Sequence, residues 1–353
     1  MRLIVFGLTL SSSWGNGHAT LWRGLGRALA RRGHQLTFFE RDVPYYAENR
    51  DLKDWADGQL VLYPDWQGIE DRVIAAIKAA DAVMITSFCP DAVAATELLA
   101  GLPACLKIFY DLDTPVTLAE FRKHGFVSYL PKDGLRSFDL VLSFTGGLAL
   151  KQLTQLLGAR KTAALYGHVD PDIHRAVQSN ETYRASLSYL GTFAADRQPA
   201  LQRLFVQPAG LMPERRFVIG GALYPTDFPW APNIFFVRHL PPSEHPAFFS
   251  SSEVTLNVTR PSMAEMGFCP SGRLFEAAAC GTAIVSDYWP GIEEFFEPGQ
   301  EIALAEKPQD VINAMSIGAE GLRGLGLAAQ RRVLARHTSE HRAKEFEGII
   351  NQI

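Results

Sequence analysis

One short segment in the second half of the chain combines residue types that suit a phosphate and a sugar diol. Ser271 and Gly272 precede a run of small and apolar residues that Gly281 closes, which predicts a short helix. Arg273 falls in the first turn of this helix, and Glu276 follows on the same face. A helix N-terminus and a guanidinium suit a diphosphate, and a carboxylate accepts hydrogen bonds from a ribose diol. A solvated arginine–glutamate pair explains the same spacing.

A second candidate is the loop that leads into the first predicted helix. Its residues Gly15, Asn16 and Gly17 lie several positions after the first strand, and Thr20 stands where a dinucleotide fingerprint has its third glycine. We therefore expect an acceptor-binding loop and no NAD or FAD site. Because imidazoles titrate near neutrality, His18 suits a general base. A histidine that only forms hydrogen bonds with the loop explains its position as well.

Two aspartates follow a buried strand farther along the first half. Asp111 and Asp113 can supply oxygen ligands to a divalent cation. They also lie at the same predicted sheet edge as His18, where either carboxylate can orient an imidazolium. Asp113, which precedes Thr114 and Pro115, equally fits a helix cap. The spacing leaves these three interpretations open.

Composition limits the class of protein. The chain has 353 residues, which suits two domains, and its formal net charge of −4 argues against a nucleic-acid partner. Four cysteines without CxxC spacing indicate buried thiols of a cytoplasmic protein. We expect no transmembrane segment, because no apolar run approaches the ~20 residues that cross a bilayer.

Apolar runs alternate with helical patterns along most of the chain. This alternation predicts an α/β fold with two Rossmann-like, doubly wound parallel sheets, in domains at 1–177 and 183–338. Helices are predicted at 18–32 and 69–79. The predicted strands lie near 2–8, 35–39, 60–63, 81–87, 104–110, 138–144 and 162–166, and near 186–191, 216–220, 234–238, 253–258, 283–286 and 301–304.

The motifs at 14–20, 110–115, 142–147 and 271–287 together resemble those of GT-B glycosyltransferases of the CgeB-like (spore maturation protein CgeB) family, from end to end. This resemblance implies two Rossmann-like domains that face a central cleft, with the C-terminal helix at 339–353 packed back on the first domain. The implied activity is transfer of a hexosyl group from a nucleoside diphosphate sugar to the hydroxyl of an unspecified acceptor. The implied reaction needs no metal and no cofactor. Phe268 stands where the retaining members have a second glutamate, so no role is carried over to it.

The resemblance and the residue chemistry together predict three groups of site residues. The predicted catalytic residues are His18, Asp111 and Asp113. The predicted donor-binding residues are Gly191, Thr192, Arg197, Asn257, Arg260, Ser271, Gly272, Arg273 and Glu276. The predicted acceptor-side residues are Gly15, Asn16, Gly17, Thr145, Gly146 and His168.

Two other functions fit the same sequence. A nucleotide-sugar epimerase or hydrolase can use the same two-domain frame, and a non-catalytic protein can bind the sugar nucleotide without turnover. Product analysis with the donor alone distinguishes the first, and binding without turnover identifies the second.

Overall fold

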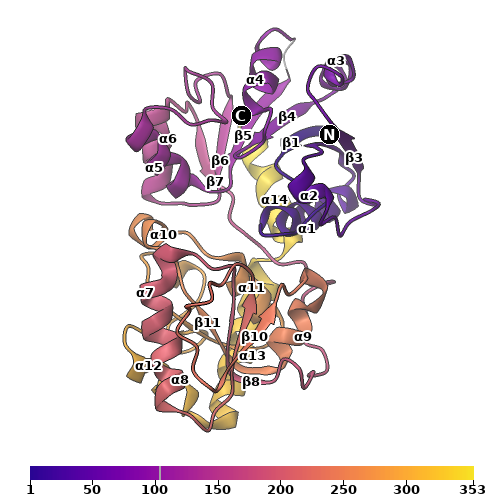
Figure 1. The fold of residues 1–353 in the computed structure, drawn as a ribbon. Helices are drawn as coiled ribbons and strands as arrows, with labels where there is room; N and C mark the ends of the chain where they lie inside the picture. Colours follow the sequence, from indigo (N-terminus) through magenta and orange to yellow (C-terminus); the bar gives the residue numbers. More distant parts are fainter. Residues whose placement is uncertain (103–104) are drawn as a thin grey trace. The chain divides into compact units, whose positions relative to one another are not determined.

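The computed structural model describes residues 1–102 and 105–353, which form two compact units (Figure 1). One unit comprises Met1–Tyr166 and Ser339–Ile353, and the other comprises Gly167–Thr338. The boundary therefore precedes the predicted one at 177. Residues after Tyr166 join the second unit because Val169 N–H donates to the carbonyl of His337 (3.0 Å) and Val177 N–H donates to Ser250 Oγ (3.1 Å).

The first unit contains a seven-stranded parallel sheet in the order β3-β2-β1-β4-β5-β6-β7. Its strands are β1 (Arg2–Gly7), β2 (Gln35–Arg41), β3 (Gln59–Tyr63), β4 (Ala82–Thr86), β5 (Leu106–Asp111), β6 (Leu140–Ser143) and β7 (Thr162–Ala164). Its helices are α1 (His18–Arg31), α2 (Pro44–Ala47), α3 (Glu70–Lys78), α4 (Ala92–Ala100), α5 (Thr114–His124), α6 (Leu148–Leu157) and α14 (Ser339–Ile350). The strand predicted at 104–110 begins at a residue outside the described ranges.

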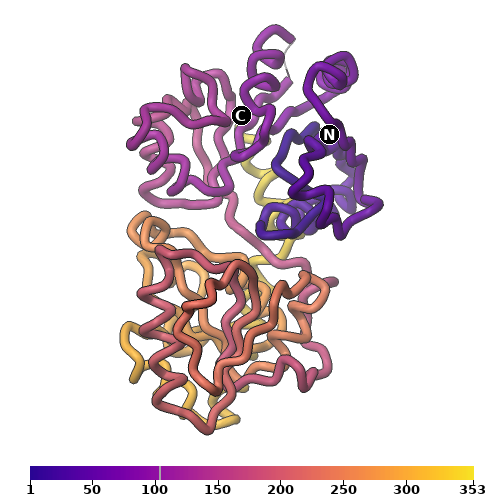
Figure 2. The backbone as a smooth tube through the Cα atoms, in the orientation of Figure 1, coloured from indigo at the N-terminus to yellow at the C-terminus, as the bar shows by residue number. Residues whose placement is uncertain are grey.

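Helix α14 packs on the first unit although it ends the chain (Figure 2). Its Phe346 is buried in the same core cluster as Trp22 and Leu29 of α1. Beside this apolar contact, Arg32 donates to both carboxylate oxygens of Glu347 at 2.8 and 2.6 Å. Burial of aromatic and aliphatic surface therefore holds the C-terminal helix, and a bidentate ion pair sets its register.

The second unit contains a six-stranded parallel sheet in the order β10-β9-β8-β11-β12-β13. Its strands are β8 (Ala185–Leu190), β9 (Phe217–Gly221), β10 (Ile234–Arg238), β11 (Ser252–Asn257), β12 (Ala283–Ser286) and β13 (Ala303–Leu304). Its α-helices are α7 (Gln198–Leu201), α8 (Gln207–Leu211), α9 (His245–Ser250), α10 (Pro261–Met266), α11 (Gly272–Ala279), α12 (Pro308–Met315) and α13 (Gly318–Arg336). The thirteen predicted strands and the α/β class with two doubly wound parallel sheets are confirmed, with strand ends shifted by at most two residues.

Strand order explains where each unit can hold a ligand. The direction of winding reverses between β1 and β4 in the first sheet and between β8 and β11 in the second. In doubly wound sheets, ligands bind outside the carboxyl ends of the strands at such switch points. The loop that leads to His18 follows β1, and the loop that contains Gly191 follows β8, so each candidate site lies at the switch point of its own sheet. Among the described residues, no helix combines the length and apolarity needed to cross a membrane.

Candidate functional site

A buried carboxylate anchors the loop between β1 and α1. Glu40, near the end of β2, is 1% exposed and accepts hydrogen bonds from the backbone N–H groups of Leu10 (2.7 Å) and Ser11 (2.9 Å). The hydroxyl groups of Thr9 and Ser11 also donate to it, at 2.9 and 2.6 Å. Four donors converge on one side chain, so Glu40 fixes the path by which the chain leaves the sheet. The sequence interpretation missed this residue, although an acid at the carboxyl end of a buried strand is a usable sign.

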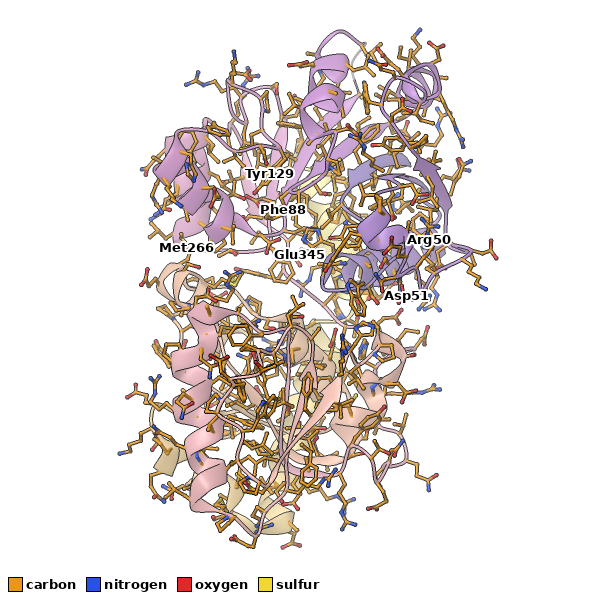
Figure 3. All side chains as sticks on the ribbon, viewed as in Figure 1. Arg50, Asp51, Phe88, Tyr129, Met266 and Glu345 are labelled. Atoms are coloured by element: carbon orange, nitrogen blue, oxygen red, sulfur yellow. The ribbon has the colours of Figure 1, made fainter. Side chains whose placement is uncertain are left out.

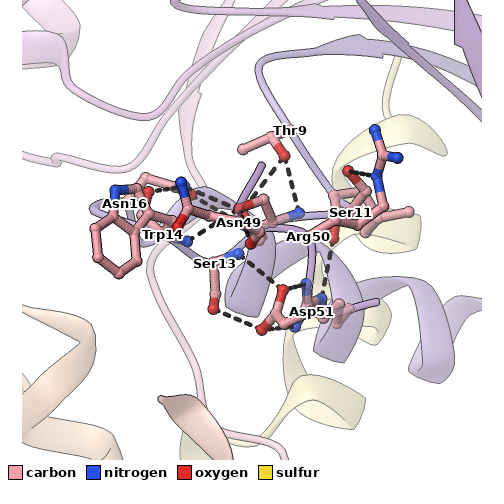
Figure 4. A network of polar contacts seen from close by, with 12 residues as sticks. Thr9, Ser11, Ser13, Trp14, Asn16, Asn49, Arg50 and Asp51 are labelled. Atoms are coloured by element: carbon pink, nitrogen blue, oxygen red, sulfur yellow. Dashed lines mark hydrogen bonds and ion pairs between the residues drawn. The ribbon is translucent and has the colours of Figure 1, made fainter. Parts of the chain in front are cut away.

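The next part of the loop is held by Asp51 and Asn16 (Figure 4). Asp51 accepts hydrogen bonds from the N–H and hydroxyl of Ser13 at 3.0 and 2.6 Å. Asn16 accepts from the N–H of Ala19 in the first turn of α1 and donates to the carbonyls of two loop residues. Gly15 has a φ of +66°, which only glycine adopts without strain. The predicted acceptor loop is therefore a preformed structure that delivers His18 to the start of α1.

The structure brings His18 to Asp113. Their Nε2 and Oδ2 atoms lie 3.0 Å apart, and the two side chains are 11% and 28% exposed. The other ring nitrogen of His18 is buried and has no hydrogen-bond partner among the described residues. The pair has the geometry of a histidine oriented by a carboxylate. It is consistent with the predicted base, whose role stays a prediction.

Asp111 lies in a different environment from Asp113. It is fully buried at the end of β5, and its Oδ1 accepts hydrogen bonds from Thr117 Oγ1 (2.9 Å) and the N–H of Asp113 (3.1 Å). Its Oδ2 has no hydrogen-bond partner in the described part of the chain. Burial raises the pKa of Asp111 to about 7, and the charge of Asp113 adds to this effect. Asp111 therefore positions the loop that carries Asp113 and presents no free carboxylate to His18.

We expect Asp111 to make stability depend on pH. Between about pH 4 and 7 the unfolded chain has released this proton while the folded chain retains it, so the free energy of unfolding falls as pH rises. A rise of about three pKa units corresponds to about 4 kcal/mol. Urea unfolding between pH 4 and 8 measures this free energy. The Asp111→Asn variant should not lose stability in this way, so its free energy of unfolding relative to that of the original chain should increase with pH.

The control for this experiment is Asp139→Asn, because Asp139 is exposed and accepts a hydrogen bond from the N–H of Lys107 at the other end of the same strand. Asp287, whose pKa burial raises to about 6, is present in all three chains and cancels in the comparison. Equal pH profiles for Asp111→Asn and the original chain would contradict the prediction.

An aromatic pair, Phe88 and Tyr129, lies beside His18 at the switch point of the first sheet. Phe88 follows β4 with a φ of 60°, a conformation that costs energy in a non-glycine residue, and its side chain is 38% exposed. Its ring centre lies 4.9 Å from that of Tyr129, and the two residues adjoin in Figure 3. The same ring centre lies 6.2 Å from that of His18. Tyr129 in turn shares a hydrogen bond with Thr117 at 2.8 Å. The sequence did not single out Phe88, because only the strand order brings it beside His18.

The remaining acceptor-side residues fall in two places. Thr145 is buried after β6, where its N–H donates to Ser143 Oγ at 3.1 Å. Gly146 lies against the Tyr166 hydroxyl so closely that a β-carbon would meet it at 2.0 Å. His168, which we predicted in the first domain, belongs to the second unit because the chain enters that unit at Gly167.

In the second unit, Arg273 reaches the end of β8. A β-carbon on Gly191 would lie 2.9 Å from Arg273 Nη2, so only glycine leaves room for the guanidinium there. Arg273 donates to Asn257 Oδ1 at 3.3 Å, and its guanidinium carbon lies 5.2 Å from the ring centre of Tyr189. Its Nε is buried without a hydrogen-bond partner among the described residues, and burial lowers its pKa. The arginine remains a cation with an unused donor at this switch point.

Arg197 adds a second cation near the same strand end. It donates to the carbonyl of Thr192 at 2.6 Å, and its buried Nε has no hydrogen-bond partner among the described residues. Its positive charge also acts on Arg273. Arg260, by contrast, is half-exposed and pairs with Asp196 at 2.7 Å. The structure thus groups Arg197 with Arg273, while a carboxylate already neutralises Arg260.

Helix α11 begins at Gly272, as its sequence predicts. Ser271 is its N-cap residue but makes no side-chain capping bond, and a β-carbon on Gly272 would meet nothing within 4 Å. Open space therefore adjoins the first turn of this helix. One turn later, Glu276 is not a solvated partner of Arg273. Its Oε2 lies 3.3 Å from His245 Nδ1, and its Oε1 lies 3.9 Å from His174 Nε2.

The charge state of Glu276 follows from these neighbours. Burial alone raises its pKa, but His174, the hydrogen bond with His245 and the charge of Arg273 outweigh burial and lower it to about 2. Glu276 is therefore a carboxylate at pH 7. We did not anticipate the two histidines, because they lie far from Glu276 in the sequence and no spacing rule connects them.

Comparisons with known proteins agree with this architecture. Residues 197–348 match the model of the family described as "Glycosyl transferase-like". Sucrose-phosphate synthase from Thermosynechococcus elongatus superposes with a TM-score of 0.72 at 14% identity, over 99% of this chain and 98% of its own. HepE from Anabaena, solved with UDP-glucose, gives 0.66 at 11% identity over 100% of both chains.

A glycosyltransferase from Rickettsia africae has a TM-score of 0.68 at 11% identity, over 99% of this chain and 97% of its own. A comparison with curated protein sequences found no significant match. At these identities the structural likeness shows the fold, and the family match covers most of the second unit. The chain therefore has the GT-B fold of these glycosyltransferase structures, and its residues 197–348 are similar to the glycosyl transferase-like family.

Proposed function

We propose that this protein transfers a hexose from a nucleoside diphosphate sugar to an acceptor hydroxyl. The observation that carries the proposal is the pair Arg197 and Arg273, whose Nε atoms are buried without a hydrogen-bond partner among the described residues. The two charges act on each other, and open space adjoins the start of α11, the helix that carries Arg273. Two arginines that no carboxylate bridges among the residues the structure describes suit a diphosphate, and the Glu276 carboxylate suits the ribose hydroxyls. The UDP-glucose complex of HepE makes a uridine nucleotide the first donor to test.

The proposed chemistry divides between the two units. On the second unit, the arginines stabilise the charge that develops on the leaving diphosphate, so no metal ion is needed in the transfer step. On the first unit, His18, oriented by Asp113, removes the proton of the acceptor hydroxyl. Asp111 is a poor metal ligand because it is buried and holds a proton up to about pH 7. Within the superfamily, the motifs at 14–20, 110–115, 142–147 and 271–287 favour the CgeB-like branch.

A ligand screen followed by product analysis tests the proposal. Thermal unfolding is measured with UDP, GDP, TDP and ADP at equal concentrations, and we expect one of them to raise the midpoint because it binds the folded state. The matching nucleotide sugar is then incubated alone and with simple sugar acceptors. A new glycoside supports transfer, whereas conversion of the donor alone indicates an epimerase or hydrolase. A screen in which no nucleotide shifts the midpoint would contradict the proposal.

A further inference from the structure

Three potential metal ligands converge in the second unit. His174 comes from the loop before β8, His245 begins α9 and Glu276 lies in α11. Besides the two histidine–carboxylate contacts described above, the imidazole rings of His174 and His245 lie 6.0 Å apart. One nitrogen or oxygen from each residue falls in a group whose members are all within 4.8 Å of one another.

His174 supplies an independent sign that the cluster binds a ligand. Its side chain is 2% exposed, and both ring nitrogens are buried without a hydrogen-bond partner among the residues that the structure describes. Buried polar groups in folded proteins are nearly always satisfied, and one that is not indicates an ion or a water molecule. Because its Nε2 faces the Glu276 carboxylate, the missing partner belongs in the space that the three side chains share.

We infer that His174, His245 and Glu276 bind a divalent transition-metal ion of the zinc and iron(II) class. Two imidazoles and one carboxylate are a donor set of zinc and non-haem iron sites, whereas magnesium and calcium take oxygen ligands. Zinc-bound nitrogen and oxygen atoms lie about 2.0–2.2 Å from the metal. The three side chains therefore need to draw together slightly around the ion, and the His245 and Glu276 side chains, 15% and 14% exposed, are less enclosed than His174.

This ion is distinct from the transfer chemistry proposed above. The diphosphate charge is assigned to Arg197 and Arg273, and an ion held by His174 and His245 shares only Glu276 with the residues assigned to the nucleotide. A carboxylate has about four lone-pair sites on two oxygens, so Glu276 can bind the ion and still accept a ribose hydroxyl. The inference does not rest on the proposed function, because the cluster and the unsatisfied imidazole are present whatever the donor is.

Metal titration of the full chain tests the inference. Protein dialysed against a chelator is titrated with ZnCl2 or MgCl2 by calorimetry, and thermal unfolding is followed in parallel. We expect one equivalent of Zn²⁺ to bind and raise the midpoint, and Mg²⁺ to do neither. His245→Ala should weaken zinc binding at least tenfold, since it removes a direct ligand. The matched control is His124→Ala, which breaks an exposed histidine–carboxylate pair, His124–Glu120, of similar separation (3.4 Å).

A second measurement covers the case in which a variant folds poorly. Co²⁺ in place of zinc gives visible absorption bands that report its coordination, and these bands should change in both His245→Ala and His174→Asn but not in His124→Ala. Zinc binding of equal strength in His245→Ala and the original chain, or no binding of zinc to the original chain, would overturn the inference. UDP binding is measured on the same samples. If the original chain binds UDP but not zinc, the metal site is contradicted and the proposed function is not.

Discussion

His18→Ala should lower kcat by about 10²–10⁴ while leaving the affinity for the nucleoside diphosphate unchanged. This range is the usual cost of removing a general base. His18 is placed for that role by the hydrogen bond from the Ala19 N–H to Asn16 and by its own 3.0 Å contact with Asp113. Donor affinity should not change, because Arg197, Arg273 and Glu276 all belong to the other unit. Steady-state kinetics and calorimetry with the same nucleotide separate the two quantities.

Two controls sharpen this result. Asp113→Asn should also lower kcat, since an amide no longer stabilises the imidazolium that forms when the base accepts a proton. His124→Ala should change neither quantity, because that histidine is exposed on α5. The base assignment would be wrong if His18→Ala kept near-normal turnover or if the product retained the anomeric configuration of the donor. In either case His18 would be a loop or acceptor-binding residue.

Arg273→Ala should weaken UDP binding by about 1.5–3 kcal/mol, or roughly 10- to 150-fold, and change uridine binding much less. The expected size is that of a hydrogen bond to a charged group. The diphosphate selectivity follows from the charge of the guanidinium, because UDP carries phosphate oxygens that uridine lacks. Calorimetric titrations of UDP and uridine against the variant measure the difference directly.

Arg273→Lys separates charge from geometry, because it keeps the cation but loses the planar fork that can contact two phosphate oxygens. The UDP affinity of Arg273→Lys should lie between those of the original chain and Arg273→Ala. Arg184→Ala is the control, since Arg184 is 72% exposed and pairs with Glu181 on the surface. Equal losses for UDP and uridine in Arg273→Ala would show that the arginine supports the fold of the site and does not contact the diphosphate.

Most of the fold could be predicted from the sequence because its elements are marked locally. Strands β1 and β4 are apolar at nearly every position, as buried parallel strands are, so their location needs no tertiary information. Helix ends were also predictable where special residues mark them, as at Gly272 of α11. The domain boundary was less predictable. The sequence suggests a first domain that ends at 177, whereas residues from Gly167 onward belong to the second unit, in which Val169 and Val177 form hydrogen bonds.

The candidate sites were likewise predictable only in part. The sequence by itself determined which residues could do chemistry, namely the helix with Arg273 and Glu276, the loop before His18 and the pair Asp111 and Asp113, because residue type and spacing within one element carry that information. Only the tertiary structure decided how they are partnered. It turned Asp113 toward His18 and buried Asp111, and it joined Glu276 to two distant histidines. These partnerships depend on strand order and on the burial that packing creates, and neither is encoded in the spacing of neighbouring residues.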